Sequence, residues 1–309
     1  MTAASIGVGF SARLARLKAR LPDSTTTTVP LSPALALTRA VLVALAVVTM
    51  SLVVELVLVS PFQQRAAQQA AYDRFRAELA LGTAPVAAGD LADKKGDPVA
   101  YLEIPSISLR QVVFEGSDAS TLFSGPGHRR DTPLPGQAGT SVVLGRRAAF
   151  GAPFDSIDSL RKNAVVRVTT GAGVFDYRVL GVRRSGDAAP AARRSGAGRI
   201  ALVTADGTPF VPSGLVIVDA DLIVPGLGGA GPSISPRSLP ESERLLAVDL
   251  STLWRLVLWL QLLLVVVLGG VFAWLRWDRA KTWIVFVPTL LLVGLLTAGE
   301  AARLLPNLL

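Results

Sequence analysis

Three long apolar runs constrain the fold of this 309-residue chain more than any other feature of its sequence. They cover residues 40–60, 253–275 and 282–299. An apolar helix of about 20 residues is long enough to cross a bilayer, so we predict three transmembrane helices. The first run lacks a small-residue cleavage site before its end, and we therefore interpret it as an uncleaved anchor rather than a signal peptide.

Positive charge beside these runs predicts their orientation. The basic tail 1–39 carries five Lys or Arg residues against one Asp, and the short loop 276–281 carries three basic residues. Cytoplasmic loops hold the excess of Lys and Arg in membrane proteins, so both segments are expected inside the cell. Three spans that start inside then place residues 61–252 outside, together with the tail 300–309 and the C-terminus.

The net charge of +8 mostly reflects this topology. Residues 1–39 contribute +4 and the chain after residue 252 contributes +3, so the membrane is the expected partner and nucleic acid is not. Cysteine is absent, which removes disulfides, thiolate metal sites and thiol nucleophiles from consideration. We expect no cofactor and no metal.

The region between the first two apolar runs divides into helix, linkers and a β domain. Residues 61–97 start with a stretch of high helix propensity, which predicts a stalk lifting the domain off the membrane, and end in a Gly- and Pro-rich linker. Residues 98–224 alternate short Val-, Ile- and Leu-rich runs with turns, which predicts a closed or sandwiched β fold. Residues 225–252 predict a second, Pro-, Gly- and Ser-rich linker. The expected strands are 100–104, 107–113, 141–144, 164–170, 174–183, 200–204 and 215–221.

Several motifs of the β domain follow one another in a recognisable order. They read LeuGluIleProSerIleSerLeu (102–109), GlyProGlyHis (125–128), ThrProLeuProGly (132–136), ValValLeuGly (142–145) and IleAlaLeuValThr (200–204). On these motifs the domain resembles the sortases, most closely the class C and class E enzymes of Gram-positive bacteria, and an actinobacterial source is expected. The resemblance implies a mainly β fold: a closed, eight-stranded sortase-like barrel, here with one N-terminal and two C-terminal transmembrane α-helices.

Sortase chemistry uses a cysteine, a histidine and an arginine, and the resemblance gives each a position in this chain. The histidine of a GlyHisArg triplet is replaced by Arg146, the cysteine after LeuValThr by Ala205, and the arginine before the last strand by Leu215. Arginine has a pKa too high for proton transfer, and alanine offers no nucleophile. The resemblance therefore predicts a catalytically inactive member rather than an enzyme.

Five residues near these positions are candidate binding residues. Arg146 and Arg147 offer planar donors for a carboxylate or phosphate, although a solvated surface pair is an open alternative. Thr204 and Asp206 flank Ala205. The single histidine, His128, is interpreted as a structural residue that bonds nearby backbone. A relocated hydrolytic site would need a hydroxyl such as that of Ser213 within about 3 Å of a histidine, and nothing in the sequence indicates one.

One acidic residue lies inside the first apolar run. A lone carboxylate is costly there, and Arg255 enters the second run at a similar depth. We therefore predict an intramembrane Glu55–Arg255 pair. A Glu55 side chain that reaches the interface, or that faces another subunit, remains an alternative.

Together these features predict a membrane-anchored, inactive sortase-like protein whose outer domain is a binding or scaffold module at the cell surface. Its expected partner is an extended peptide or a neighbouring cell-surface or membrane protein. Two alternatives stay open: a divergent hydrolase or transpeptidase with a relocated site, and a structural subunit of a membrane transport or secretion complex.

Overall fold

The computed structural model describes residues 33–309 except 92–93, 193, 229–230, 249, 251–252 and 277–278. The chain divides into two compact units, residues 1–42 and 43–309. Of the first unit, the described part is the beginning of helix α2 (Pro33–Val54). The basic tail 1–39 therefore lies almost entirely outside the described residues. All contacts discussed below lie within residues 43–309.

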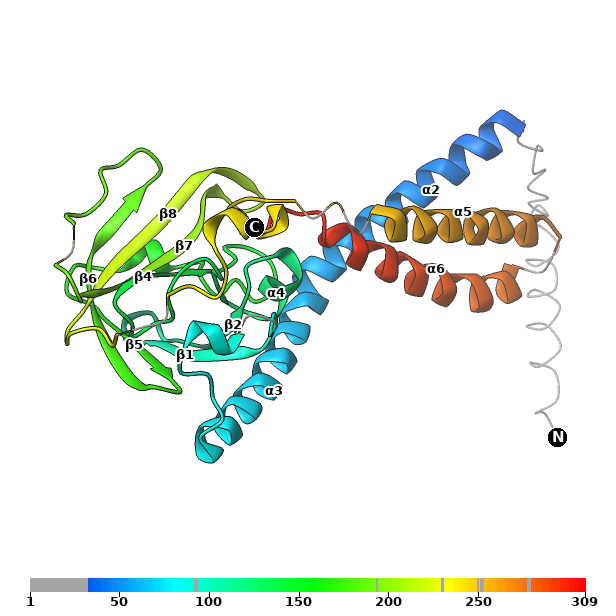
Figure 1. Ribbon diagram of the computed structural model, residues 1–309. Helices are drawn as coiled ribbons and strands as arrows, with labels where there is room; N and C mark the ends of the chain where they lie inside the picture. The colour runs from blue at the N-terminus through cyan, green and yellow to red at the C-terminus, as the bar shows by residue number, and fades with distance from the viewer. Residues whose placement is uncertain are drawn as a thin grey trace, which may run out of the picture. The chain divides into compact units, whose positions relative to one another are not determined.

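The β domain is a closed barrel (Figure 1). Its strands run in the order β1-β2-β3-β4-β7-β8-β6-β5 and close through the β1–β5 pairing. The pairs β2–β3 and β4–β7 are parallel, and the others are antiparallel. The strands are β1 Pro98–Ile104, β2 Leu109–Glu115, β3 Gly127–His128, β4 Gly139–Leu144, β5 Val165–Thr170, β6 Gly173–Arg184, β7 Gly198–Thr208 and β8 Val211–Leu222. The predicted fold class is confirmed. Strand β3, only two residues long, is the one that the hydrophobic pattern did not predict.

Alternation along the strands builds two apolar layers, because successive side chains of a strand point to opposite faces. On β7, Ile200 and Leu202 are fully buried in the barrel interior. Their neighbours Val203 and Ala205 instead belong to a second cluster, which we call the outer cluster. The barrel wall at β7 is thus buried on both faces, and something must cover its outer side.

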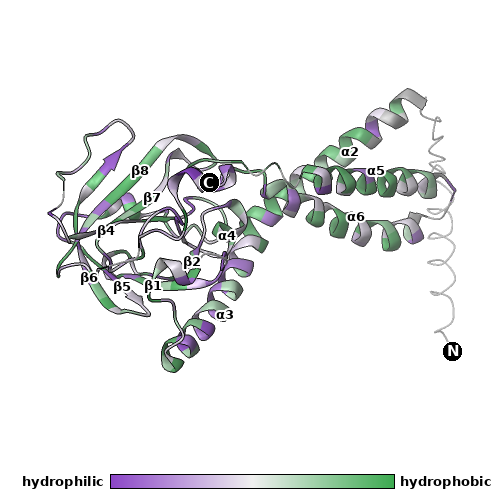
Figure 2. Cartoon of the chain, in the orientation of Figure 1, coloured by the Kyte–Doolittle hydropathy of each residue, from purple (hydrophilic) through white to green (hydrophobic). Residues whose placement is uncertain are grey.

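Three helices in the described part of the chain are long and apolar enough to cross a membrane: Val41–Leu81, Leu253–Trp274 and Ala280–Ala302. The first combines α2, a π-helical segment (Glu55–Val59) and α3 (Ser60–Leu81). The other two correspond to α5 (Leu253–Arg276) and α6 (Arg279–Ala302), which lie side by side. Figure 2 shows that α5 and α6 are predominantly hydrophobic along their length. Such exposed apolar helix surface fits a lipid environment.

Helix α3 does not form a free stalk, because it packs along the barrel. Phe75 is only 1% exposed, and the Gln68 amide makes two hydrogen bonds with the main chain of Val112 on β2. High helix propensity predicted the helix. Its docking could not be predicted, because polar residues such as Gln68 are equally typical of a solvent-exposed helix surface. Helix α3 packs against β1 and β2.

The Pro-, Gly- and Ser-rich segment 225–252 also packs on the barrel. Ser233 donates to Glu115 Oε1 at 2.8 Å, and Ser117 donates to the carbonyl oxygen of Glu243 at 2.9 Å. Leu246 joins the outer cluster. The predicted linker is therefore part of the cover over the outer face of β7.

Candidate functional site

Arg146, Ala205 and Leu215 come from different parts of the chain to one place on the outer face of the barrel. Ala205 on β7 is the direct cross-strand partner of Leu215 on β8, and both lie in the outer cluster. Arg146 follows β4, which runs parallel to β7. Thr204 fixes this connection, because its hydroxyl donates to the carbonyl oxygen of Gly145 at 2.8 Å.

Arg146 is the most unusual member of the site, since its side chain is fully buried. The guanidinium carbon lies 4.6 Å from the ring centre of Phe123 and 5.1 Å from that of Phe150. Nη1 donates to the main-chain oxygen of Leu309 at 2.6 Å, and Nη2 lies 3.5 Å from the carbonyl oxygen of Ala119. The alternative of a solvated surface pair is wrong for this residue, because the cation is enclosed by aromatic rings and main-chain oxygens.

Burial lowers the pKa of Arg146 to about 9, and the nearby carboxylate of Asp118 opposes that shift. The guanidinium is therefore still positive at neutral pH and cannot act as a general base there. Burial tends to raise the pKa of Asp118 itself, but hydrogen bonds from Ser120 and Thr121, together with Lys95, hold it below its ordinary value. The site therefore holds a positive guanidinium beside the Asp118 carboxylate.

Residues 305–309, which we call the docked segment, occupy this site. Helix α6 ends at Ala302, and the chain then forms a turn in which Leu309 N donates to Pro306 O at 3.1 Å. Figure 1 shows this end of the chain beside the barrel. The side chains of Leu308 and Leu309 are 0% and 3% exposed. They complete the outer cluster with Leu122, Leu144, Val203 and Ala205.

Polar contacts also hold Asn307 and Leu308 of this segment. The side-chain amide of Asn307 donates to the carbonyl oxygens of Ser117 and Arg244, each at 2.8 Å. Asn307 N donates to Ala247 O at 3.0 Å, and Arg147 N donates to Leu308 O at 3.0 Å. Residues 300–309 were predicted as an outer tail, but the docking was not predicted, because it depends on contacts with residues far away in the sequence.

The remaining predicted binding residues have separate surroundings. Arg147 donates to Asp158 Oδ2 at 2.9 Å and, more weakly, to the carbonyl oxygen of Ala205 at 3.4 Å. Asp206 accepts from Arg184 Nε at 3.1 Å, at the end of the strand. Arg146, Arg147 and Thr204 are thus brought together around the site, whereas the Asp206 carboxylate is engaged with Arg184.

His128 lies on β3, fully buried, in a polar node of its own. Its Nδ1 is 2.8 Å from Glu115 Oε2 and its Nε2 is 3.0 Å from Pro133 O. Burial alone would lower the pKa of His128, but the Glu115 carboxylate and the Pro133 carbonyl outweigh it and the pKa is raised. Both ring nitrogens face acceptors, which is the arrangement that a protonated, structural histidine satisfies.

A hydroxyl also lies near this histidine, as a relocated catalytic site would require. Thr132 Oγ1 is 3.2 Å from His128 Nε2. However, this hydroxyl donates to Arg129 O at 2.7 Å and accepts from Val142 N at 3.2 Å. A nucleophile must give its proton to the base, and here the proton is directed to a carbonyl oxygen. The geometry is that of a structural hydrogen-bond network.

The predicted Glu55–Arg255 pair is not formed among the described residues. The Glu55 carboxylate, 5% exposed, accepts from Gln63 Nε2 at 3.4 Å. The guanidinium of Arg255 is exposed and lies over the ring of Trp254 at 5.5 Å. Glu55 begins the π-helical segment, and this change of helical winding brings Gln63 of the next helix within reach.

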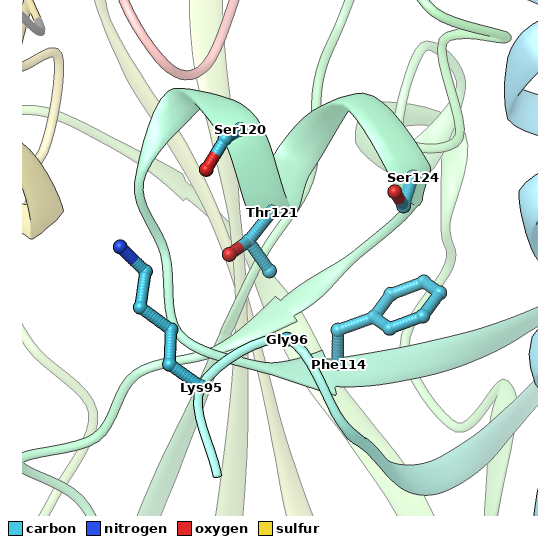
Figure 3. A pocket seen from close by; sticks show the side chains of 6 residues that line it. All are labelled: Lys95, Gly96, Phe114, Ser120, Thr121 and Ser124. Atoms are coloured by element: carbon cyan, nitrogen blue, oxygen red, sulfur yellow. The ribbon is translucent and has the colours of Figure 1, made fainter. Parts of the chain in front are cut away.

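A small cavity of about 200 Å³ opens beside helix α4 (Ala119–Ser124), adjoining the site. Figure 3 shows that α4 supplies its hydroxyl side chains, while Lys95 and Gly96 form the opposite wall. Lys95 Nζ lies 3.1 Å from Asp118 Oδ2. The lysine is therefore already neutralised by the residue that caps α4.

The fold is a closed eight-stranded β-barrel, and Arg146, Ala205 and Leu215 lie together on its outer face. Residues 102–223 match the family model described as the sortase domain. This part of the chain is therefore similar to the sortase domain, and the chain contains no cysteine.

Individual relatives are similar over part of the chain. Sortase D of Bacillus subtilis (strain 168) is 32% identical over 85 residues, which are 28% of this chain and 41% of that protein. This chain thus spans less than half the length of that relative. Among solved structures, a sortase D5 transpeptidase of Clostridium perfringens is 22% identical, with a TM-score of 0.43, over 52% of this chain and 99% of its own. A mutant of sortase E from Streptomyces avermitilis is 27% identical, with a TM-score of 0.37, over 49% and 99%.

Proposed function

We propose that this chain is a membrane-anchored, non-catalytic protein whose sortase-type barrel serves as a binding or scaffold module on the outer side of the membrane. The observation that carries the proposal is the convergence of Arg146, Ala205 and Leu215 at one site. A thioester mechanism needs a thiol nucleophile and a proton carrier. The three positions supply a methyl group, an isobutyl group and a permanent cation instead.

The barrel itself remains intact, which argues that it is kept for a purpose other than chemistry. Its interior is filled by a continuous set of fully buried residues such as Leu102, Val168 and Leu202. A domain that only anchored the chain would not need a buried ionic node such as Glu115–His128, which is costly to assemble. Conservation of the fold without the catalytic groups fits a module that binds or positions another molecule.

The membrane helices support the proposed location. Helix α6 ends at the barrel, where Ala302 packs with Ala149 and Phe150. The other end of the 24-residue α6, which begins with Arg279 and Lys281, then lies about 36 Å away, which matches the thickness of a bilayer with part of its headgroups. The positive-inside rule puts that basic end in the cytoplasm and the barrel outside.

Restoration of the catalytic groups tests the proposal. The full chain, purified in nanodiscs, is compared with the combined variant Arg146→His, Ala205→Cys and Leu215→Arg, with and without residues 305–309. Sorting-type peptides are supplied, and the readouts are peptide binding, peptide cleavage and a covalent adduct detected by mass spectrometry. Once residues 305–309 are removed, we expect peptide binding without cleavage by the chain with the native Arg146, Ala205 and Leu215, and an adduct in the restored variant.

The matched control is Ala205→Cys alone, which has a nucleophile but no proton carrier. We expect Ala205→Cys alone to be acylated at least about 10²-fold more slowly than the combined variant, since general acid–base catalysis contributes at least this factor. Cleavage of any peptide by the parent chain would overturn the proposal and favour a relocated active site.

A further inference from the structure

We propose that residues 305–309 are a built-in ligand of the vacated catalytic site, and that the site accepts an apolar, turn-forming segment of another chain only after they leave. The inference rests on the proposed function, because it names what the non-catalytic site binds. Three features of the contact support it: the buried charge of Arg146, the apolar packing of Leu308 and Leu309, and the hydrogen bonds that the Asn307 side chain makes.

The charge comes first, because a buried cation requires acceptors. Arg146 is fully enclosed, and the shorter of its two hydrogen bonds, at 2.6 Å, goes to the main-chain oxygen of Leu309, which lies 163 residues further along the chain. The other, to Ala119 O, is 3.5 Å long. Leaving a buried charge without its partner is strongly unfavourable. The guanidinium therefore selects a ligand that presents a main-chain oxygen at this point.

The apolar fit involves the other two vacated positions. Ala205 and Leu215 lie opposite one another on β7 and β8 and face Leu308 and Leu309 within the outer cluster. The small Ala205 side chain takes up little room at this surface, and Leu215 adds an aliphatic wall. The three substitutions that remove the chemistry thus together build an apolar site with one buried donor, and the docked segment satisfies both properties.

Hydrogen bonds to one side chain, that of Asn307, further restrict which ligands fit the site. Its amide nitrogen lies between the carbonyl oxygens of Ser117 and Arg244, at 2.8 Å from each. Only a side chain with two N–H donors fits this position, because a carboxylate would face two acceptors. The turn closed between Pro306 and Leu309 then directs both leucine side chains into the cluster. The ligand class is therefore a Pro-Asn-Leu-Leu type turn rather than an extended strand.

The same contacts connect the site to the membrane. Ala302, the last residue of α6, is fully buried against Ala149 and Phe150. The Phe150 ring stacks on Phe123 at 4.0 Å, and both rings cover Arg146. The end of α6, the docked segment and the aromatic cover of Arg146 are therefore in direct contact with one another.

The absence of native cysteine provides a direct test. Ala205→Cys places a single thiol in the full chain, in nanodiscs, and the rate of its modification by a small maleimide reports access to the site. We expect the thiol to be protected when the segment is seated. Adding Asn307→Asp, or ending the chain at residue 304, should raise the rate at least tenfold. The control thiol Val224→Cys, on the exposed surface, should react at the same rate in all three backgrounds.

A synthetic peptide of residues 303–309 should protect Ala205→Cys again in the truncated chain, whereas a scrambled peptide should not. Equal modification rates with and without the segment, or no protection by the peptide, would overturn the inference. This result is separable from the proposed function, because peptide cleavage by the parent chain would refute that function while leaving the protection pattern unchanged.

Discussion

Two fully buried basic side chains in this protein are satisfied in opposite ways. His128 finds its partners within the barrel: Glu115 on the adjacent strand and the carbonyl of Pro133, five residues ahead. Arg146 makes its shorter hydrogen bond with Leu309, which follows two further long apolar helices along the chain. The first node is complete once the barrel has folded, whereas the second requires the docked segment.

This difference separates what maintains the fold from what occupies the site. The Glu115–His128 node is tied into the barrel wall and into the segment 225–252 through Ser233. The Arg146 site lies on the outer face and can lose its occupant while the strands stay paired. A change at the first node should therefore unfold the barrel, and a change at the second should mainly release residues 305–309.

The largest effect is expected from Glu115→Ala. Removing the carboxylate leaves a fully buried histidine without its ionic partner, and breaking such a pair costs about 3–5 kcal/mol of unfolding free energy. The matched variant Glu115→Gln keeps the shape and a hydrogen-bonding carbonyl and should lose less. Chemical denaturation of the full chain, followed by the near-ultraviolet circular dichroism of the barrel, measures both. Similar stability of Glu115→Ala and the parent would show that the node does not hold the barrel.

A smaller loss is expected from Leu308→Ala combined with Leu309→Ala. Two buried leucines within a core would together cost more than about 4 kcal/mol. Here the segment can detach with the barrel still folded, so the loss cannot exceed the free energy of docking, and we expect about 1–2 kcal/mol. Hydrogen exchange should become faster in residues 303–309 and around Arg146 but not in the interior strands. Faster exchange throughout the barrel would erase the distinction between the two regions.

The comparison also shows what the sequence could predict. Hydrophobic runs and alternation predicted the long apolar helices and the β domain, because these depend on local patterns. The resemblance to sortases predicted the closed eight-stranded barrel and singled out Arg146, Ala205 and Leu215, and the structure places these three residues together. The occupant of the site depends on contacts between residues far apart in sequence, and Asn307 reads as an ordinary turn residue. The predicted Glu55–Arg255 pair is not formed for a related reason, since similar depth does not fix which way two helices face. Gln63 of α3 donates to Glu55 instead.

The pH dependence should distinguish the two nodes further. The pKa of His128 is raised in the folded protein, so its contribution to stability is fully present below the ordinary value of 6.5 and is lost as the pH rises through the folded-state pKa. The parent should therefore lose stability across that window, and Glu115→Gln should lose less of it. Denaturation midpoints measured in steps from pH 5.5 to about 9 provide the check. If the stability of Glu115→Gln changed with pH in the same way as that of the parent, the Glu115–His128 pair would not be the cause of the pH dependence.

The smallest effect is expected in the membrane. Arg255 is exposed and contacts Trp254 rather than Glu55, so Arg255→Leu should change stability by no more than about 0.5 kcal/mol. Glu55→Leu, which removes a buried acceptor of Gln63, should have a larger effect. Detergent-induced unfolding of the helices compares the two. Equal, large losses of stability in both variants would support the predicted Glu55–Arg255 ion pair.

The central claim is that residues 308 and 309 lie against Ala205 in the outer cluster. The most direct test is a disulfide in the otherwise cysteine-free chain, formed in native membranes by a mild oxidant, between Ala205→Cys and either Leu308→Cys or Leu309→Cys. Disulfide formation needs the two Cα atoms within about 7 Å. The account predicts rapid intramolecular closure of at least one of these pairs and none between Val224→Cys and Leu309→Cys. Failure of both pairs, or equal closure of the control, would contradict the claim that the site is filled by its own chain.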